Sequence, residues 1–99
     1  MDIAEANKNW KNAELNYADA KNKYRELKLE LNLQKSKLAL KTKEEWAELG
    51  ITNQQSRDAY ITIKTESLAR DVLHAKKCVD EFSVESTYLE NCFNILVSV

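Results

Sequence analysis

The chain has 99 residues, a formal net charge of −1, a single glycine, no proline and two cysteines. This length accommodates one small domain with a core of marginal size, so association between copies is expected. The scarcity of glycine and proline argues against turn-rich β folds and glycine-rich phosphate loops, and no apolar run approaches the roughly 20 residues that cross a bilayer.

Apolar residues recur in alternating steps of three and four along the first half of the chain. This heptad spacing keeps one stripe of a helix against a partner helix, and we therefore predict a helix over residues 2–49. The series comprises Ile3, Ala6, Trp10, Ala13, Tyr17, Ala20, Tyr24, Leu27 and Leu31, then polar Gln34, then Leu38.

Leu29, Leu33 and Leu40 lie outside this series. Their spacings of four and seven place them on one face of a helix, as a second apolar stripe. A lone helical hairpin would leave that stripe exposed to water. We therefore expect another chain to cover it.

The end of the first helix has two interpretations. The segment from Thr42 to Glu45 matches a capping box, in which a threonine hydroxyl and a glutamate close the start of a helix. Either the helix continues to residue 49, or it breaks near Thr42 and a short helix follows, with Trp46 and Leu49 packed on the end of the hairpin.

The turn is predicted at residues 50–52. Gly50 follows Leu49 as a left-handed helix end, and Thr52 with Gln55 forms a second capping box. So short a connection makes neighbouring helices antiparallel.

A second heptad series predicts a helix over residues 53–97. The whole chain is therefore an all-α single domain over residues 1–99, a long coiled-coil-like antiparallel helical hairpin that self-associates into a bundle. Tyr88, Cys92 and Ile95 add an apolar stripe beside the series. The series comprises Ile61, Thr65, Leu68, Val72, Ala75, Val79, Phe82, Ser86, Leu89, Phe93 and Leu96.

Charge is unevenly distributed along the chain. Residues 21–43 contain eight basic and two acidic residues, whereas residues 78–99 contain four acidic residues and no lysine or arginine. An antiparallel hairpin brings Lys21 near Glu81, and Lys21, Lys28 and Lys35, seven apart, are placed for interhelical ion pairs.

The residues that carry chemistry are few. His74 and Cys78 face one side of a helix, but a metal site needs three or four ligands, and Cys92 lies too far along the helix to join them. Two thiols too far apart for a disulfide fit a reducing cytoplasm. We predict no catalytic residue, metal site or cofactor.

Polar and aromatic residues are densest around the turn. Asp58 near a helix start suits the helix dipole, and Arg57 is placed to stack on Trp46, close to Tyr60. The same group could receive an anion, a nucleotide or a loop of a partner protein.

Two short motifs mark this turn, Trp-x-x-Leu-Gly at residues 46–50 and Arg-x-Ala-Tyr at residues 57–60. Through both motifs, the segment resembles small helical proteins encoded by phages and prophages of Gram-positive bacteria. The resemblance implies expression in the cytoplasm of a bacterial host and carries over no catalytic residue. Proteins of this type serve as recombination or replication accessories, or as inhibitors of host defence.

We therefore predict a non-enzymatic binding protein that acts by protein–protein interaction, as an inhibitor of host defence. Two alternatives stay open: a nucleic-acid accessory factor, and an oligomeric binder of a nucleotide signal with Arg57 on phosphate and Tyr60 stacked on the base. The partner contacts predicted for the first function are Trp46, Arg57, Tyr60, Leu29, Leu33 and Leu40. The nucleic-acid contacts predicted for the second are Lys21, Arg25, Lys28, Lys35 and Lys37.

Overall fold

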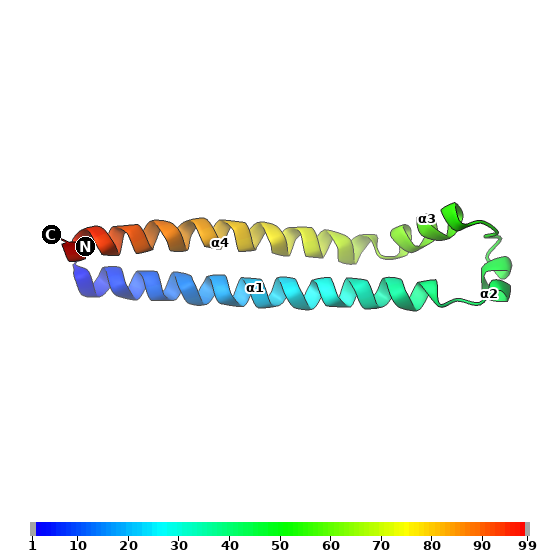
Figure 1. Ribbon diagram of the computed structural model, residues 1–99, viewed down its shortest axis with the longest axis horizontal. Coiled ribbons are helices and arrows are strands. Elements are labelled where there is room, and N and C mark those ends of the chain that lie inside the picture. The colour runs from blue at the N-terminus through cyan, green and yellow to red at the C-terminus, as the bar shows by residue number, and fades with distance from the viewer. Residues whose placement is uncertain (1, 99) are drawn as a thin grey trace. The chain divides into compact units, whose positions relative to one another are not determined.

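A computed structural model of the chain describes residues 2–98, which form helices and no strand. The helices are α1 (Ile3–Ala39), α2 (Lys43–Glu48), α3 (Gln54–Lys64) and α4 (Glu66–Ser98) (Figure 1). The described residues divide into two compact units: unit 1 combines residues 2–25 with residues 74–98, and unit 2 comprises residues 26–73. The predicted all-α class is confirmed.

Unit 1 is an antiparallel pair formed by the first part of α1 and the last part of α4 (Figure 1). Its buried positions carry small side chains, namely Ala6, Ala13, Ala75 and Ser86. Near the chain ends, the Trp10 and Phe93 rings stack with centroids 5.3 Å apart and planes 27° apart. Small residues let the two helices pack closely, and the stacked rings add an aromatic contact near the chain ends.

Helix α1 begins at a side-chain cap. The Asp2 Oδ1 atom accepts the Glu5 N–H at 2.7 Å, and the Asp2 carbonyl accepts the Ala6 N–H at 3.0 Å. These bonds satisfy backbone donors that have no partner inside the helix, and the carboxylate suits the positive end of the helix dipole.

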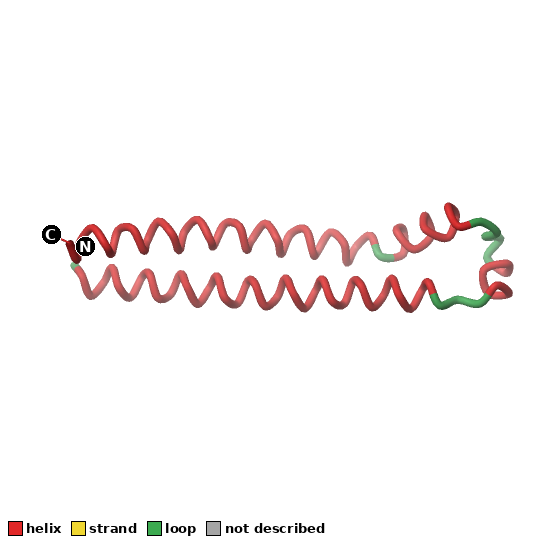
Figure 2. The backbone as a smooth tube through the Cα atoms, in the orientation of Figure 1, coloured by secondary structure: helices red, strands yellow, loops and turns green. Residues whose placement is uncertain are grey.

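Unit 2 contains the end of α1, all of α2 and α3, and the start of α4 (Figure 2). Helix α1 ends at Ala39, and the Thr42 Oγ1 atom accepts the Glu45 N–H at 3.2 Å at the start of α2. The chain thus breaks near Thr42, and a continuous helix over residues 2–49 is wrong. The break occurs because the threonine hydroxyl replaces backbone hydrogen bonds at this point.

Gly50 closes α2 in the left-handed conformation, with φ of +73°, as predicted. The Ile51 N–H donates to the Trp46 carbonyl at 3.0 Å, and the Gly50 N–H donates to the Ala47 carbonyl at 2.9 Å. This pair of bonds is a Schellman motif, which satisfies carbonyls at the end of a helix.

The cap of α3 is Asn53, and the predicted cap at Thr52 is wrong. The Asn53 Oδ1 atom accepts the Ser56 N–H at 2.7 Å, and the Asn53 carbonyl accepts the Arg57 N–H at 3.1 Å. Asparagine is preferred over threonine at this position, so the helix begins one residue later than the capping-box pattern indicated.

The predicted helix over residues 53–97 is also wrong as one piece, because Thr65 separates α3 from α4. The Thr65 hydroxyl donates to the Ile61 carbonyl at 2.8 Å. Such back-bonding from a threonine to the preceding turn bends helices.

Within each unit, the heptad residues form the contact between helices. Every residue of the second series is buried or half-buried, and in the first series Ile3 and Gln34 are the exposed exceptions. The spacing therefore predicted the buried face correctly, including the polar positions Thr65 and Ser86. No helix among residues 2–98 is long and apolar enough to cross a bilayer.

Candidate binding surfaces

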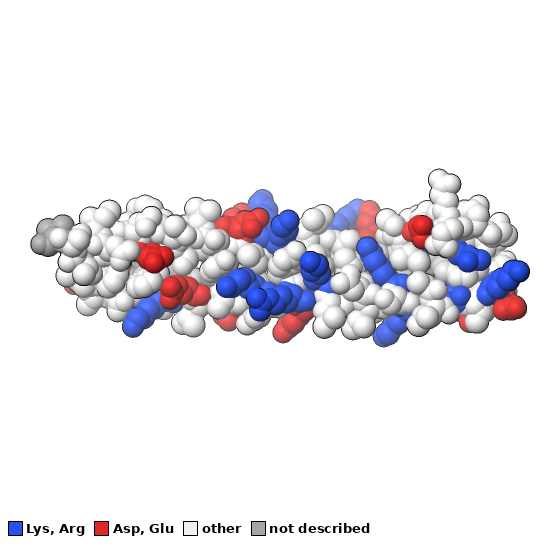
Figure 3. Space-filling model, viewed as in Figure 1, with Lys and Arg blue, Asp and Glu red and all other residues white. Residues whose placement is uncertain are grey.

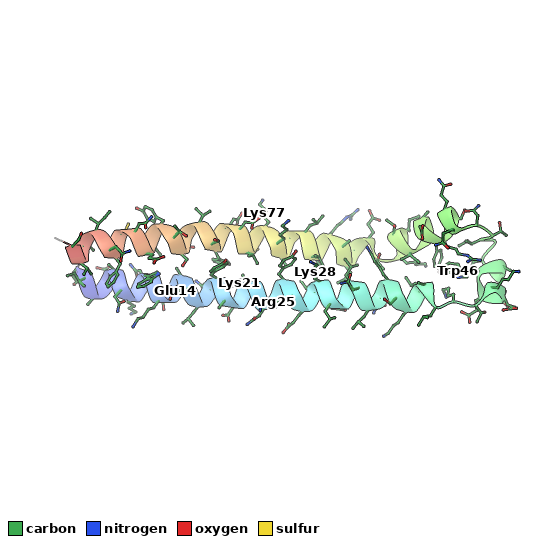
Figure 4. The ribbon with its side chains drawn as sticks, in the orientation of Figure 1. Glu14, Lys21, Arg25, Lys28, Trp46 and Lys77 are labelled. Atoms are coloured by element: carbon green, nitrogen blue, oxygen red, sulfur yellow. The ribbon has the colours of Figure 1, made fainter. Side chains whose placement is uncertain are left out.

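Trp46 organises the end of unit 2 where α2 meets α3 (Figure 4). Its side chain is buried, with 2% of the residue exposed. Tyr60 meets the Trp46 ring edge-on, with centroids 5.5 Å apart and planes 85° apart. The Arg57 Cζ atom lies 5.7 Å from the centroid of the same ring, which confirms the predicted contact.

Cations flank these rings. The Lys64 Nζ atom lies 5.5 Å from the Tyr60 centroid, one helical turn further along α3. Within the described chain, no carboxylate forms an ion pair with Arg57 or Lys64, and the neighbouring Asp58 carboxylate accepts the Gln54 amide at 2.8 Å. We name Arg57, Tyr60 and Lys64 the cation–aromatic patch.

The Arg57 side chain is half-buried, and its Nε atom is buried with no hydrogen-bond partner. A buried donor without an acceptor lowers stability by roughly 1–3 kcal/mol. Because the Nε atom is covered, only the rest of the guanidinium can meet a bound molecule. It forms no ion pair within the described residues, so it is the strongest attachment point in this patch.

Trp46 does not lie on the surface, so the predicted contact of its ring with a partner is not available in this structure. Its ring is covered because Tyr60 and Arg57 pack against it. The buried Trp46 ring is the surface against which Arg57 and Tyr60 of the patch pack. Lys64 was missed from the sequence, although its spacing of four residues from Tyr60 on one helix was the available signal.

The leucines outside the heptad series are exposed, as predicted. The exposed fractions are 60% for Leu29, 52% for Leu33 and 81% for Leu40. We name these three residues the α1 stripe. Contiguous exposed apolar side chains are typical of surfaces that another chain covers.

Unit 1 has a comparable surface on α4. Val84, Tyr88 and Ile95 are exposed, and Cys92 is half-buried beside them. We name Val84, Tyr88 and Ile95 the α4 stripe, of which Val84 was missed from the sequence. On the face drawn in Figure 3, few charged atoms lie at the chain-end part of unit 1. A hydrogen bond to Cys92 and the charge of its thiolate raise the pKa of Tyr88.

The basic residues of α1 differ in their surroundings (Figure 4). The Lys21 Nζ atom lies 4.2 Å from the centroid of the Tyr17 ring, and Lys21 forms no ion pair with Glu81, contrary to the prediction. A flexible lysine reaches a ring one turn away at little entropic cost. Three other residues of the predicted set, Arg25, Lys35 and Lys37, are exposed, and Lys28 has an interaction within the chain.

His74 and Cys78 lie together on α4, with 3.8 Å between Nε2 and Sγ. Among residues 2–98, no three potential metal ligands come together. The cysteines Cys78 and Cys92 are both free thiols.

Two grooves lie among the described residues. In unit 2, a groove of about 420 Å³ lies beside Thr65. Its lining includes Lys64 of the cation–aromatic patch, the acidic Glu30 and Asp71, and the apolar Leu38 and Leu68. In unit 1, a groove of about 300 Å³ is lined mainly by asparagines and Glu85. Neither groove contains Arg57 or Tyr60, the residues predicted to hold a nucleotide.

Comparison with known protein families, with curated proteins and with solved structures finds no match to this chain. The resemblance of the turn to small phage proteins therefore stays a prediction. The function has to be argued from the surfaces described above.

Proposed function

We propose that the chain is a non-enzymatic binding protein that associates with itself and holds a target protein on the cation–aromatic patch. The observation that carries the proposal is the Arg57 guanidinium, held against the buried Trp46 ring and without a carboxylate partner among the described residues. Arginine and tyrosine are the residue types that most often dominate the binding energy of protein interfaces.

The chemistry of the patch specifies the kind of target. Arg57 lies against the Trp46 ring and Lys64 against the Tyr60 ring, so the complementary surface carries acidic side chains around an apolar or planar group. The binding would act by covering a surface of the target. Following the resemblance of the turn, we propose that the target belongs to a host defence system and that the protein works in the bacterial cytoplasm.

Substitution of Arg57 tests this proposal directly. The tagged protein is used to capture partners from phage-infected host lysate, with half of each sample treated with nuclease. We expect a stoichiometric protein partner that survives nuclease treatment and is lost with Arg57→Ala. Circular dichroism of the variant establishes that its helices are retained.

Arg70→Ala is the matched control for that experiment. Arg70 is an exposed arginine of unit 2 that pairs with Glu66 at 2.6 Å, outside the patch. Capture should be unchanged in this variant. Equal capture by the wild type and by Arg57→Ala would overturn the assignment of the patch.

A nucleic-acid function is the second candidate, favoured by the exposed cations of α1. Arg25, Lys35 and Lys37 have no ion-pair partner within the described residues. If they contact phosphates, the affinity for an oligonucleotide falls steeply as salt concentration rises. Capture of partners that disappear on nuclease treatment, and loss of oligonucleotide binding in Lys35→Ala, would replace the first proposal with this one.

A further inference from the structure

The α1 stripe follows one face of α1 as far as the last turn of the helix. Leu29, Leu33, Ser36 and Leu40 follow one another in steps of four, three and four, which places them on one helix face. The Leu40 N–H donates to the Ser36 carbonyl at 3.1 Å, so Leu40 still follows the helical path. The opposite side of the helix carries buried Leu31, a residue of the heptad series.

Two exposed charges of opposite sign border this stripe. Glu30 follows Leu29 by one residue, and Lys37 follows Ser36 by one residue. Because they are seven apart, both lie on the same edge of the stripe. Neither forms an ion pair within the described part of the chain.

We propose that the α1 stripe is the contact between two copies of this chain, with their α1 helices antiparallel. This inference rests on the self-association in the proposed function and names the surface that mediates it. Leu29 of each copy faces Leu40 of the other, and Leu33 faces Ser36. In this register Glu30 of each copy lies beside Lys37 of the other, so the two-fold symmetry forms the ion pair twice.

The charges favour this orientation over a parallel one. Glu26 occupies the next position of the stripe, three residues before Leu29. In a parallel pair, Glu26 would face Glu26 of the other copy, and like charges in that arrangement repel. In the antiparallel pair it lies beyond the leucines and meets no copy of itself.

The same pattern identifies the occupant as a second copy. The edge of the stripe carries both Glu30 and Lys37, so this face of α1 is complementary to itself, as a two-fold interface must be. Three leucines from each copy bury much less than the roughly 1,600 Å² of a standard stable interface. The dimer is therefore weak and forms at high protein concentration.

Sedimentation equilibrium of the full chain, from low micromolar to millimolar concentration, measures this dimer. Leu29→Glu places a charge in the stripe, and we expect at least about tenfold weaker association. Leu15→Glu is the matched control, because Leu15 is 63% exposed and lies two heptads earlier on the same face of α1. That variant should associate as the wild type does.

A charge exchange tests the orientation. Glu30→Lys alone and Lys37→Glu alone each replace two attractive pairs with two repulsive ones, and each should weaken the dimer about fivefold to tenfold. The double variant Glu30→Lys/Lys37→Glu rebuilds both pairs with the signs exchanged. It should restore the wild-type affinity.

The outcomes separate this inference from the proposal on which it rests. A wild-type chain that stays monomeric at every concentration overturns both the self-association and the stripe contact. Association that Leu29→Glu leaves unchanged, and that Tyr88→Glu weakens, overturns the α1 contact alone and moves it to the α4 stripe. Weakening by Leu15→Glu, or a double variant that is not restored, overturns the antiparallel register.

Discussion

Unit 1 is built from two uninterrupted helix segments, whereas unit 2 contains the end of α1, all of α2 and α3, and the start of α4. The buried residues differ in the same way. In unit 1 they are alanines and a serine that recur with the heptad, and in unit 2 they are larger or irregularly placed: Leu31, Trp46 and Thr65. The same heptad pattern thus occurs in a simple pair of helices in unit 1 and in the interrupted helices of unit 2. The helix caps and the buried Trp46 distinguish unit 2 from unit 1.

Trp46→Ala should have the largest effect on this comparison. Removing the buried ring leaves a cavity beneath Arg57 and Tyr60, at an expected cost of about 3–5 kcal/mol in the free energy of unfolding. Trp10→Ala in unit 1 should lower the free energy of unfolding by less, because Trp10 is half-buried and is one of several residues of the first heptad series. Urea denaturation followed by circular dichroism measures both, and equal losses would remove the contrast between the units.

Ala13→Leu tests how closely the two helices of unit 1 pack. Ala13 is buried where the two helices pack, so the larger side chain forces them apart, and we expect a loss of about 1–3 kcal/mol. Ala18→Leu, at an exposed position of the same helix, should change stability by less than about 0.5 kcal/mol. A stabilised Ala13→Leu variant in thermal denaturation would mean that the helices of unit 1 are not closely packed.

Gly50→Ala tests the helix ends of unit 2. No atom lies within 4 Å of the added Cβ, so the cost comes from the left-handed backbone alone, at about 1–2 kcal/mol. Gly50→Asn should cost less, because asparagine adopts this conformation more readily. The melting temperatures of the two variants should therefore follow the order Ala below Asn, and the reverse order would contradict the backbone explanation.

The Tyr88–Cys92 pair gives the smallest effect, confined to alkaline pH. The pKa of Tyr88 is raised above its usual 10.0, so the folded state favours the protonated phenol. Its small contribution to stability is present below pH 10 and is lost as the pH rises through the raised pKa. Ultraviolet titration of the phenol should show a lower pKa in Cys92→Ala, closer to the usual value, and an unchanged titration would exclude Cys92 as the main cause.

The heptad residues show how much of the fold could be predicted from the sequence. Spacing alone placed polar Thr65 and Ser86 on the buried face, because periodicity reports geometry and not hydrophobicity. It could not reveal the interruption at Thr65, since a threonine that bonds back to Ile61 occupies the same position in the pattern as one that does not. The position of the α3 cap depended on a choice between adjacent Thr52 and Asn53.

The candidate site was less predictable for a physical reason. Helix α2 has six residues, too few to show a period, so the sequence left open both a Trp46 packed on the end of the hairpin and a Trp46 that contacts a partner. Its burial depends on Tyr60 and Arg57, which lie on another helix. The exposure of the α1 stripe was predictable, because those leucines fall outside a long and regular series.

The left-handed backbone at Gly50 also limits which inherited changes the chain can accept. A single-nucleotide change in a glycine codon gives alanine, valine, serine, cysteine, arginine, tryptophan, aspartate or glutamate. None gives asparagine, the residue that most often replaces glycine in this conformation. No atom lies within 4 Å of the position that a Cβ would occupy, so the first atom of a side chain meets no steric obstacle there. The constraint at this position therefore comes from a backbone dihedral angle rather than from a clash at the Cβ.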